Sequence, residues 1–192
     1  TNIDFQYILF NDNGDKEIWE DVKEFKNDTE YIYSDINYGK KMCSGGWVGA
    51  IPYLEGEYIH NVGQDDVMTY TFYKTAVDTL DNNKDVYLVS FNGLKVNEDL
   101  TFKEFLIHPE ASPNYDKPLE IFKEWFGVQD DKLTRANNGL LAPGTIYRRE
   151  LHKLIGPPDV EGFKGACDME YWTRILFNEY KCKFFNIPTW LY

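Results

Sequence analysis

Short apolar segments alternate with segments of helical periodicity along most of this chain, and this alternation restricts the possible folds more than any other feature. Residues typical of strands occur at 5–10, 31–33, 58–62, 86–91 and 183–187. Apolar residues at helical spacing predict helices over 15–26, 42–54, 73–80 and from 168 onward. Strands and helices in such alternation predict an α/β fold with a mostly parallel central sheet flanked by helices.

The segment between residues 97 and 131 breaks this rhythm. Turn signals and the prolines Pro109, Pro113 and Pro118 interrupt it. We expect it to be an excursion beside the sheet that carries acceptor or partner contacts, or else a plain covering element. After it, residues 140–148 are expected to be extended, and residues 149–155 are expected to form a helical turn.

The composition fits a single globular domain. The chain has 192 residues, of which 43% are hydrophobic and 17% aromatic, and this is enough for one apolar core. Its net charge is -12 and its pI is about 4.7. Proteins that bind nucleic acids usually neutralise phosphates with an excess of Lys and Arg, so nucleic acid is not an expected partner.

Cysteine usage and hydropathy bear on the compartment. Cys43, Cys167 and Cys182 are odd in number and lack C-x-x-C spacing, which favours neither a zinc site nor a disulfide framework and leaves a cytoplasmic location as the simplest expectation. No apolar run reaches the roughly 18 residues of a membrane span, and no signal peptide is recognised. Because the chain begins at Thr1 without a methionine, we expect it to be a domain of a longer protein.

The most informative local feature is the segment 56–68, in which an apolar strand leads into the adjacent carboxylates of Asp65 and Asp66. Adjacent carboxylates repel each other, and hard cations such as Mg²⁺ or Mn²⁺ prefer oxygen ligands, so the pair is a candidate metal site. A solvated turn that caps the next helix is the alternative. Asp12 also follows a strand, and ligands of α/β sheets gather at the carboxyl ends of strands, which favours a binding site.

Four motifs follow one another in a distinctive order: Asn-Asp-Asn-Gly at 11–14, Asn-Tyr-Gly at 37–39, a strand leading to Gln-Asp-Asp at 56–66, and a block at 144–174 that contains Asp168. In this order they resemble the motifs of glycosyltransferase family 2, whose members have the GT-A fold. The first resembles the Asp-Asp-Gly-Ser type of turn, the third resembles the DxD-type metal motif, and the last resembles the acceptor-side block that ends in a catalytic Asp.

The resemblance implies transfer of a sugar, with inversion, from a nucleotide-diphosphate donor, a UDP-sugar being favoured, to an unidentified glycan, lipid-linked or protein acceptor. Asp168 corresponds to the general base that takes the proton of the acceptor hydroxyl. Asp66 corresponds to the ligand of Mn²⁺ or Mg²⁺, which neutralises the leaving diphosphate. The residues that correspond to donor contacts are Asn11, Asp12, Asp65 and Arg148.

Each of these residues also has a structural alternative. Asp12 is suited to a turn and Asp168 to a helix N-cap. Arg148 can form a salt bridge to Glu150 or to the acidic surface, and this alternative is favoured over a contact with the donor's phosphates.

The sequence also departs from the family. Its members usually begin with a further strand and helix, and this sequence, which starts at Thr1, does not contain them. Without these elements we expect two strand edges to be unpaired. Cys167 stands where a Glu often precedes the catalytic Asp. The Gln-x-x-Arg-Trp block of processive synthases is missing, so a single-addition enzyme is expected. The alternatives are a module that binds a nucleotide sugar or glycan without turnover, and a nucleotidyltransferase, which lacks its glycine-rich, lysine-bearing phosphate loop here.

Overall fold

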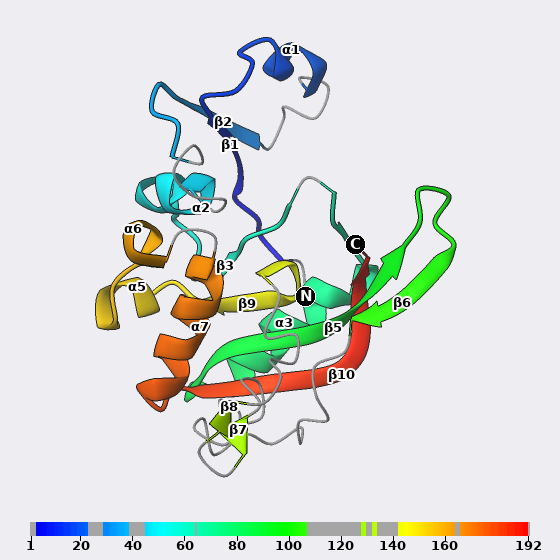
Figure 1. Ribbon diagram of the computed structural model, residues 1–192, viewed down its shortest axis with the longest axis vertical. Helices are drawn as coiled ribbons and strands as arrows, with labels where there is room; N and C mark the ends of the chain where they lie inside the picture. The colour runs from blue at the N-terminus through cyan, green and yellow to red at the C-terminus, as the bar shows by residue number, and fades with distance from the viewer. Residues whose placement is uncertain are drawn as a thin grey trace.

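The computed structural model describes residues 3–22, 29–38, 45–63, 65–106, 128–129, 132–133, 142–163 and 166–191. A six-stranded sheet flanked by helices dominates it (Figure 1), so the predicted α/β fold is confirmed. The strand order is β3 (Tyr58–His60), β9 (Thr145–Arg148), β5 (Val86–Val96), β10 (Lys181–Leu191) and β4 (Val67–Met68), with β6 (Phe102–Leu106) also paired to β5. Two small sheets join β1 (Tyr7–Asp12) to β2 (Thr29–Ser34) and β7 (Val128–Gln129) to β8 (Lys132–Leu133).

The two longest described helices cover opposite faces of the six-stranded sheet. The helical segments are α1 (Ile18–Val22), α2 (Gly45–Ala50), η2 (Ile51–Tyr53), α3 (Tyr70–Asn82), η3 (Ala142–Gly144), α5 (Leu151–Leu154), α6 (Val160–Phe163) and α7 (Cys167–Phe177). Side chains of α3 pack with Val89 of β5 in one core cluster, whereas side chains of α7 pack with Leu88 in the other. Because β5 is buried on both faces, apolar residues predominate in its N-terminal part, although Ser90 and Asn92 are buried there as well. None of the described helices has the length and apolar character needed to cross a membrane.

The six-stranded sheet is mixed. β3, β5 and β10 share one direction, because β5 pairs with β10 in parallel and β9 is antiparallel to both β3 and β5. Parallel pairing, which we predicted for most of the sheet, joins the two longest strands and also joins β1 to β2. β4, β6 and β9 run the other way. For β6 the reason is local, since it follows β5 through a tight turn in which Leu100 has a φ of 63°, and a short turn makes neighbouring strands antiparallel.

Most predicted elements are present with shifted ends. β1 begins two residues later than predicted, β3 ends at His60, and β5 and β10 extend beyond their predicted ranges. The irregular segment 97–131 contains β6 and β7, and its residues 107–127 and 130–131 lie outside the described residues. α1 accounts for part of the predicted helix 15–26, whose residues 23–26 are likewise not described. The short elements β4 and α6 were not predicted, because two and four residues are too few to show a period.

Among the described residues, β1 has one edge without a strand partner, and β3 forms one edge of the six-stranded sheet. The side chain of Gln6, just before β1, links the two sheets. Its amide donates from Nε2 to the carbonyl of Tyr53 over 2.9 Å and accepts at Oε1 from the N–H of Glu55 over 2.8 Å. Both partners lie in the segment that leads into β3, so this amide fastens the start of β1 to the edge of the larger sheet.

Candidate functional site

The acidic pair lies on the loop between β3 and β4. The backbone N–H of Gly63 donates to Oδ2 of Asp66 over 3.0 Å, and the N–H of Asp66 donates back to the carbonyl of Gly63 over 3.3 Å. A Cβ placed on Gly63 would lie 2.7 Å from Oδ2 of Asp66 and 2.8 Å from Oδ1 of Asp65. Both carboxylates therefore converge on the same side of Gly63, and glycine is needed there because any side chain would displace them.

The electrostatics of this loop favour a bound cation. Burial raises the pKa of Asp66, the Gly63 N–H opposes this shift, and the charge of the exposed Asp65 adds to it. Oδ1 of Asp66 is buried without a hydrogen-bond partner, a state that costs free energy unless something else satisfies the oxygen. The charged form of Asp66 is thus poorly stabilised by the protein alone.

Asp65 and Asp66 suit a metal ion that is bound jointly by the protein and by a substrate. Within the described part of the chain, no group of three or more His, Cys, Asp or Glu residues is placed to hold a metal ion. Mg²⁺ in phosphate-binding sites commonly takes one or two carboxylates and completes its coordination with phosphates and water. Asp66, with Asp65 beside it, therefore fits a cation that arrives with a diphosphate and takes its remaining ligands from phosphate and water.

Asn11 and Asp12 form the turn at the end of β1. The amide of Asn11 donates to the carbonyl of Asp15 and to the hydroxyl of Tyr31, both over 2.8 Å, and its Oδ1 accepts from the N–H of Gly14 over 2.7 Å. Oδ1 of Asp12 accepts from the backbone N–H of Tyr38 over 2.7 Å. The bonds of Asn11 with Asp15 and Gly14 are local turn contacts, whereas the bond of Asp12 joins the end of β1 to the segment after β2, and both side chains are thereby fixed at the carboxyl end of β1.

Helix α2 lies between Asp12 and Asp168. A Cβ on Gly46 of α2 would lie 3.9 Å from Cβ of Asp12. Two residues further along α2, Val48 packs against the cluster that contains Cys167, the neighbour of Asp168. Figure 1 shows the same grouping of α2, α6 and the upper end of α7. The structure thus brings the elements that carry these two aspartates together.

Asp168 is the second residue of α7. The N-cap position belongs to Ala166, so the alternative in which Asp168 caps the helix is wrong, and the helix begins one residue earlier than predicted. The half-buried carboxylate lies in the first turn, where the partial positive charge of a helix N-terminus stabilises a negative charge. No hydrogen bond of this carboxylate is present in the part of the chain that the structure describes, so it is available to an incoming proton donor.

Arg148 lies at the opposite end of β3 from the acidic pair, since it is paired with Tyr58, the first residue of that strand. It is only 4% exposed. Its guanidinium donates to the carbonyls of Val86 over 2.8 Å and Leu80 over 2.6 Å and forms an ion pair of 3.2 Å with Glu57. The salt-bridge alternative therefore describes its contacts, with Glu57 in place of Glu150, and a contact with donor phosphates stays a prediction.

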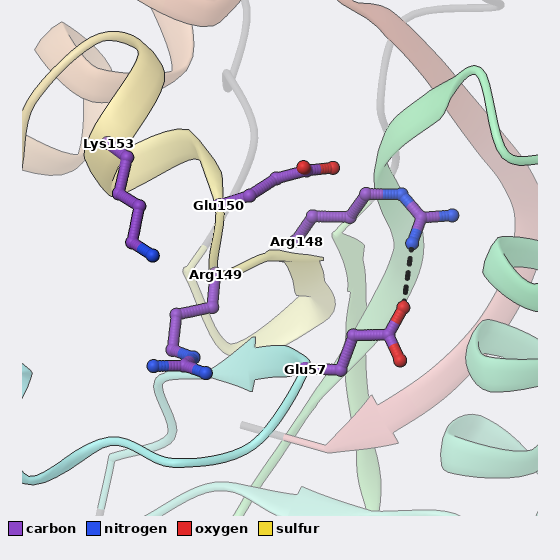
Figure 2. Close-up of a pocket in the computed structure, with 5 residues that line it drawn as sticks. All are labelled: Glu57, Arg148, Arg149, Glu150 and Lys153. Atoms are coloured by element: carbon purple, nitrogen blue, oxygen red, sulfur yellow. Dashed lines mark hydrogen bonds and ion pairs between the residues drawn. The ribbon is translucent and has the colours of Figure 1, made fainter.

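Figure 2 shows the pocket beside Arg148, which has a volume of about 180 Å³. It is lined by Glu57, Arg148, Arg149, Glu150 and Lys153. Arg149 donates to the carbonyls of Gly56 and Leu54, so it fastens the start of β3. The register of β3 against β9 puts this pocket away from the loop that carries Asp65 and Asp66.

His60 and Tyr73 complete the surroundings of the acidic loop. The sequence indicates an ordinary polar role for His60, because His60, His108 and His152 show no metal-ligand spacing. Both of its ring nitrogens are hydrogen bonded, Nδ1 to the hydroxyl of Tyr73 over 3.1 Å and Nε2 to the carbonyl of Pro143 over 2.8 Å. No sequence signal could have found this network, since the three residues come from separate elements.

Comparison with known proteins identifies the fold. Neither a protein-family model nor a curated protein matches the sequence. The crystal structure of TarS from S. aureus matches with a TM-score of 0.70 and 17% identity, over 97% of this chain and 30% of that chain. TarS 1-349 in complex with UDP matches with a TM-score of 0.65 and 16% identity, over 96% of this chain and 50% of that chain. The complex of TarS 1-349 with UDP-GlcNAc matches with a TM-score of 0.67 and 15% identity, over 96% of this chain and 48% of that chain.

At such identities the likeness shows the fold alone. This chain has the α/β fold of the nucleotide-diphospho-sugar transferases, the GT-A fold, as predicted. It spans between about a third and a half of the length of the TarS chains that it matches. Membership of glycosyltransferase family 2 in particular stays a prediction.

Proposed function

We propose that this domain binds a nucleotide-diphosphate sugar, with a UDP-sugar favoured, and transfers the sugar to an acceptor hydroxyl. The observation that carries the proposal is Asp66, whose Oδ1 is buried without a partner beside a second carboxylate on the loop after β3. The fold supports it, because the matching TarS is a glycosyltransferase and was crystallised with UDP and with UDP-GlcNAc.

The metal corner of the proposed site consists of Asp66 with Asp65 beside it. Mn²⁺ or Mg²⁺, when bound, would neutralise the negative charge of the leaving diphosphate. Asp66 would hold the ion through the oxygen that lacks a hydrogen bond, and Gly63 would keep the two carboxylates together. Asp65, which is exposed, would face the ribose or the sugar of the donor.

The acceptor side of the proposed site is the first turn of α7. Asp168 would act as general base and take the proton of the acceptor hydroxyl as this oxygen attacks the anomeric carbon from the face opposite the diphosphate, which gives inversion. Asn11 and Asp12 would contact the nucleotide at the end of β1. Arg148 would serve as a brace of the sheet, because its donors are occupied by carbonyls and by Glu57.

The test is donor hydrolysis and transfer with and without Mn²⁺, for the wild type and for Asp66→Ala and Asp168→Asn. We expect both variants to lose most of the activity and only Asp66→Ala to lose metal-dependent UDP binding. Asp35→Ala is the matched control, since Asp35 is an exposed carboxylate whose ion pair with Lys16 spans 3.8 Å. Wild-type rates in both variants would show that the assigned roles are wrong.

A second candidate is a module that binds a nucleotide sugar or glycan without turnover. The separation of β1 and β2 from the six-stranded sheet favours it, because the strand that carries Asp12 is not paired with the sheet that carries Asp66. Binding of UDP with Mn²⁺ but no transfer to any acceptor, and no hydrolysis, in the full protein would favour this candidate. The cytoplasmic location, the single addition of sugar and the exclusion of nucleic acid as a partner stay predictions.

A further inference from the structure

The protonation of His60 follows from its two partners. The carbonyl of Pro143 can only accept, so Nε2 carries the ring proton and donates it. Burial lowers the pKa of His60 to about 4, and the ring is therefore neutral at neutral pH. Nδ1 of a neutral ring with its proton on Nε2 is an acceptor, so the hydroxyl of Tyr73 donates to it.

These two hydrogen bonds lie at the base of the acidic loop. His60 is the last residue of β3, before the loop, and Tyr73 lies in the first turn of α3, after it. Their rings are also in edge-to-face contact, with centroids 5.4 Å apart. The third partner, Pro143, belongs to η3, which leads into β9, the neighbour of β3 in the sheet.

We propose that His60, held between Tyr73 and Pro143, is a positioning residue that joins the end of β3 to the start of α3, the two elements that flank the segment carrying Asp65 and Asp66. Among the described residues, the loop's own hydrogen bonds join only Gly63 and Asp66, and Asp65 is exposed. Beyond the acidic pair, β4 pairs with β10 and the N–H of Thr69 donates to the carbonyl of Thr189 over 2.7 Å, so the far end of the loop is also held by the sheet. The link between β3 and α3 keeps the carboxylates of Asp65 and Asp66 together beside Gly63. The inference rests on the proposed function wherever it concerns metal and UDP, and His60 itself is assigned no contact with either.

The chain offers a matched control for this role. Tyr58, the first residue of β3, donates its hydroxyl to Oδ1 of Asp81 near the end of α3, over 2.6 Å. Two tyrosine hydroxyls thus join the same pair of elements, Tyr73 at the acidic loop and Tyr58 at the other end. Removing either one deletes a single hydrogen bond between β3 and α3, but only Tyr73 lies at the base of the loop.

The experiment compares Tyr73→Phe, His60→Gln and Tyr58→Phe with the wild type. It measures the thermal midpoint, the hydrogen-exchange rate of the peptide 61–69, and the Kd of UDP in the presence of Mn²⁺. We expect the two tyrosine variants to lose similar thermal stability. Tyr73→Phe should speed exchange of this peptide and weaken UDP binding by about fivefold each, the factor expected from the loss of one ordinary hydrogen bond.

His60→Gln keeps a donor for Pro143 at a place similar to Nε2 but offers no acceptor at the place of Nδ1, so it should behave like Tyr73→Phe. Tyr58→Phe should leave both the exchange rate of this peptide and the Kd within about twofold of the wild type. Equal exchange rates in Tyr73→Phe and Tyr58→Phe would refute the positioning role, and so would wild-type exchange in His60→Gln. If the wild type binds no UDP with Mn²⁺, the proposed function fails, while the exchange rates still decide whether His60 positions the loop.

Discussion

Replacement of Asp66 by asparagine should make the metal-free protein more stable while abolishing its response to metal. The carboxylate of Asp66 has a raised pKa, mainly through burial, and one oxygen without a partner. An amide is neutral and costs less to withdraw from water, and its oxygen can still accept the hydrogen bond from the N–H of Gly63. The substitution therefore removes an unfavourable charge and keeps the local turn.

The size of the effect follows from the half-buried state of Asp66. An unsatisfied buried polar group costs about 1–3 kcal/mol, and the partial exposure of Asp66 puts it at the lower end, about 1 kcal/mol. For a domain of this length, such a gain raises the thermal midpoint by about 2–4 °C. Because the folded-state pKa is raised, this gain should be present at neutral pH and should vanish as the pH falls through the raised pKa towards the ordinary value of 3.8.

The metal should reverse the order of stability. A ligand that binds only the folded state stabilises it by RT ln(1 + [L]/Kd), so Mn²⁺ at about ten times its Kd should add about 1.4 kcal/mol to the wild type and nothing to the asparagine variant. Thermal unfolding with and without MnCl₂ and UDP measures both effects. Asp85→Asn is the control of opposite sign, because a hydrogen bond from Lys181 lowers the pKa of Asp85 and its loss cannot stabilise the fold. A lower midpoint for metal-free Asp66→Asn, or an equal Mn²⁺ response in both proteins, would refute this reasoning.

Three further predictions concern the loop, the sheet and the histidines. Gly63→Ala should abolish the Mn²⁺ response, because its Cβ would collide with both carboxylates, whereas Gly46→Ala, whose Cβ would lie 3.7 Å from Phe10, should keep it in the same thermal assay. In urea titrations, Arg148→Ala should lower the free energy of unfolding by about 3 kcal/mol, since several hydrogen bonds to a charged group are lost. Arg149→Ala, at an exposed position, should lower it by less than about 1 kcal/mol. Burial lowers the pKa of His60 and His152 to about 4 from 6.5, so stability should fall as the pH drops from about 6.5 to about 4, and His152→Gln should flatten this dependence.

The fold could be predicted because its central strand and helix have recognisable local sequence patterns. The run from Val86 to Phe91 is mostly apolar, with Ser90 as a buried polar exception, as expected for a strand buried on both faces, and it forms the middle of the sheet. The spacing of Phe72, Ala76 and Leu80 gives α3 one apolar stripe, which packs on that strand. Such signals depend only on neighbours in sequence. Strand order and direction depend on contacts between residues far apart in the sequence, so the antiparallel pairing of β9 and of β4 was not predicted.

The candidate site could be predicted only in part, for the same reason. Asp65 and Asp66 could be identified as candidates because they follow an apolar strand and occupy the third place in an ordered set of motifs, although Asp-Asp alone is a common pair. The state of Asp66 Oδ1 depends on burial by surrounding elements, which the sequence does not reveal. Arg148 illustrates the opposite case, in which a residue that suits phosphate by type has its donors engaged by carbonyls of α3 and β5.

The attachments of the aspartates divide the candidate site into two separately supported parts. The acidic loop is tied to the six-stranded sheet and to α3 through His60 and Tyr73, so its shape depends on the main core. Asp12 and Asp168 are instead related through α2, which contacts the end of β1 on one side and the start of α7 on the other. β1 does not pair with the larger sheet; α2 contacts its end at Asp12, while Gln6 and the edge-to-face contact of Phe5 with Tyr73 attach its start. A disturbance of α2 should therefore alter nucleotide and acceptor contacts together while leaving the metal corner intact.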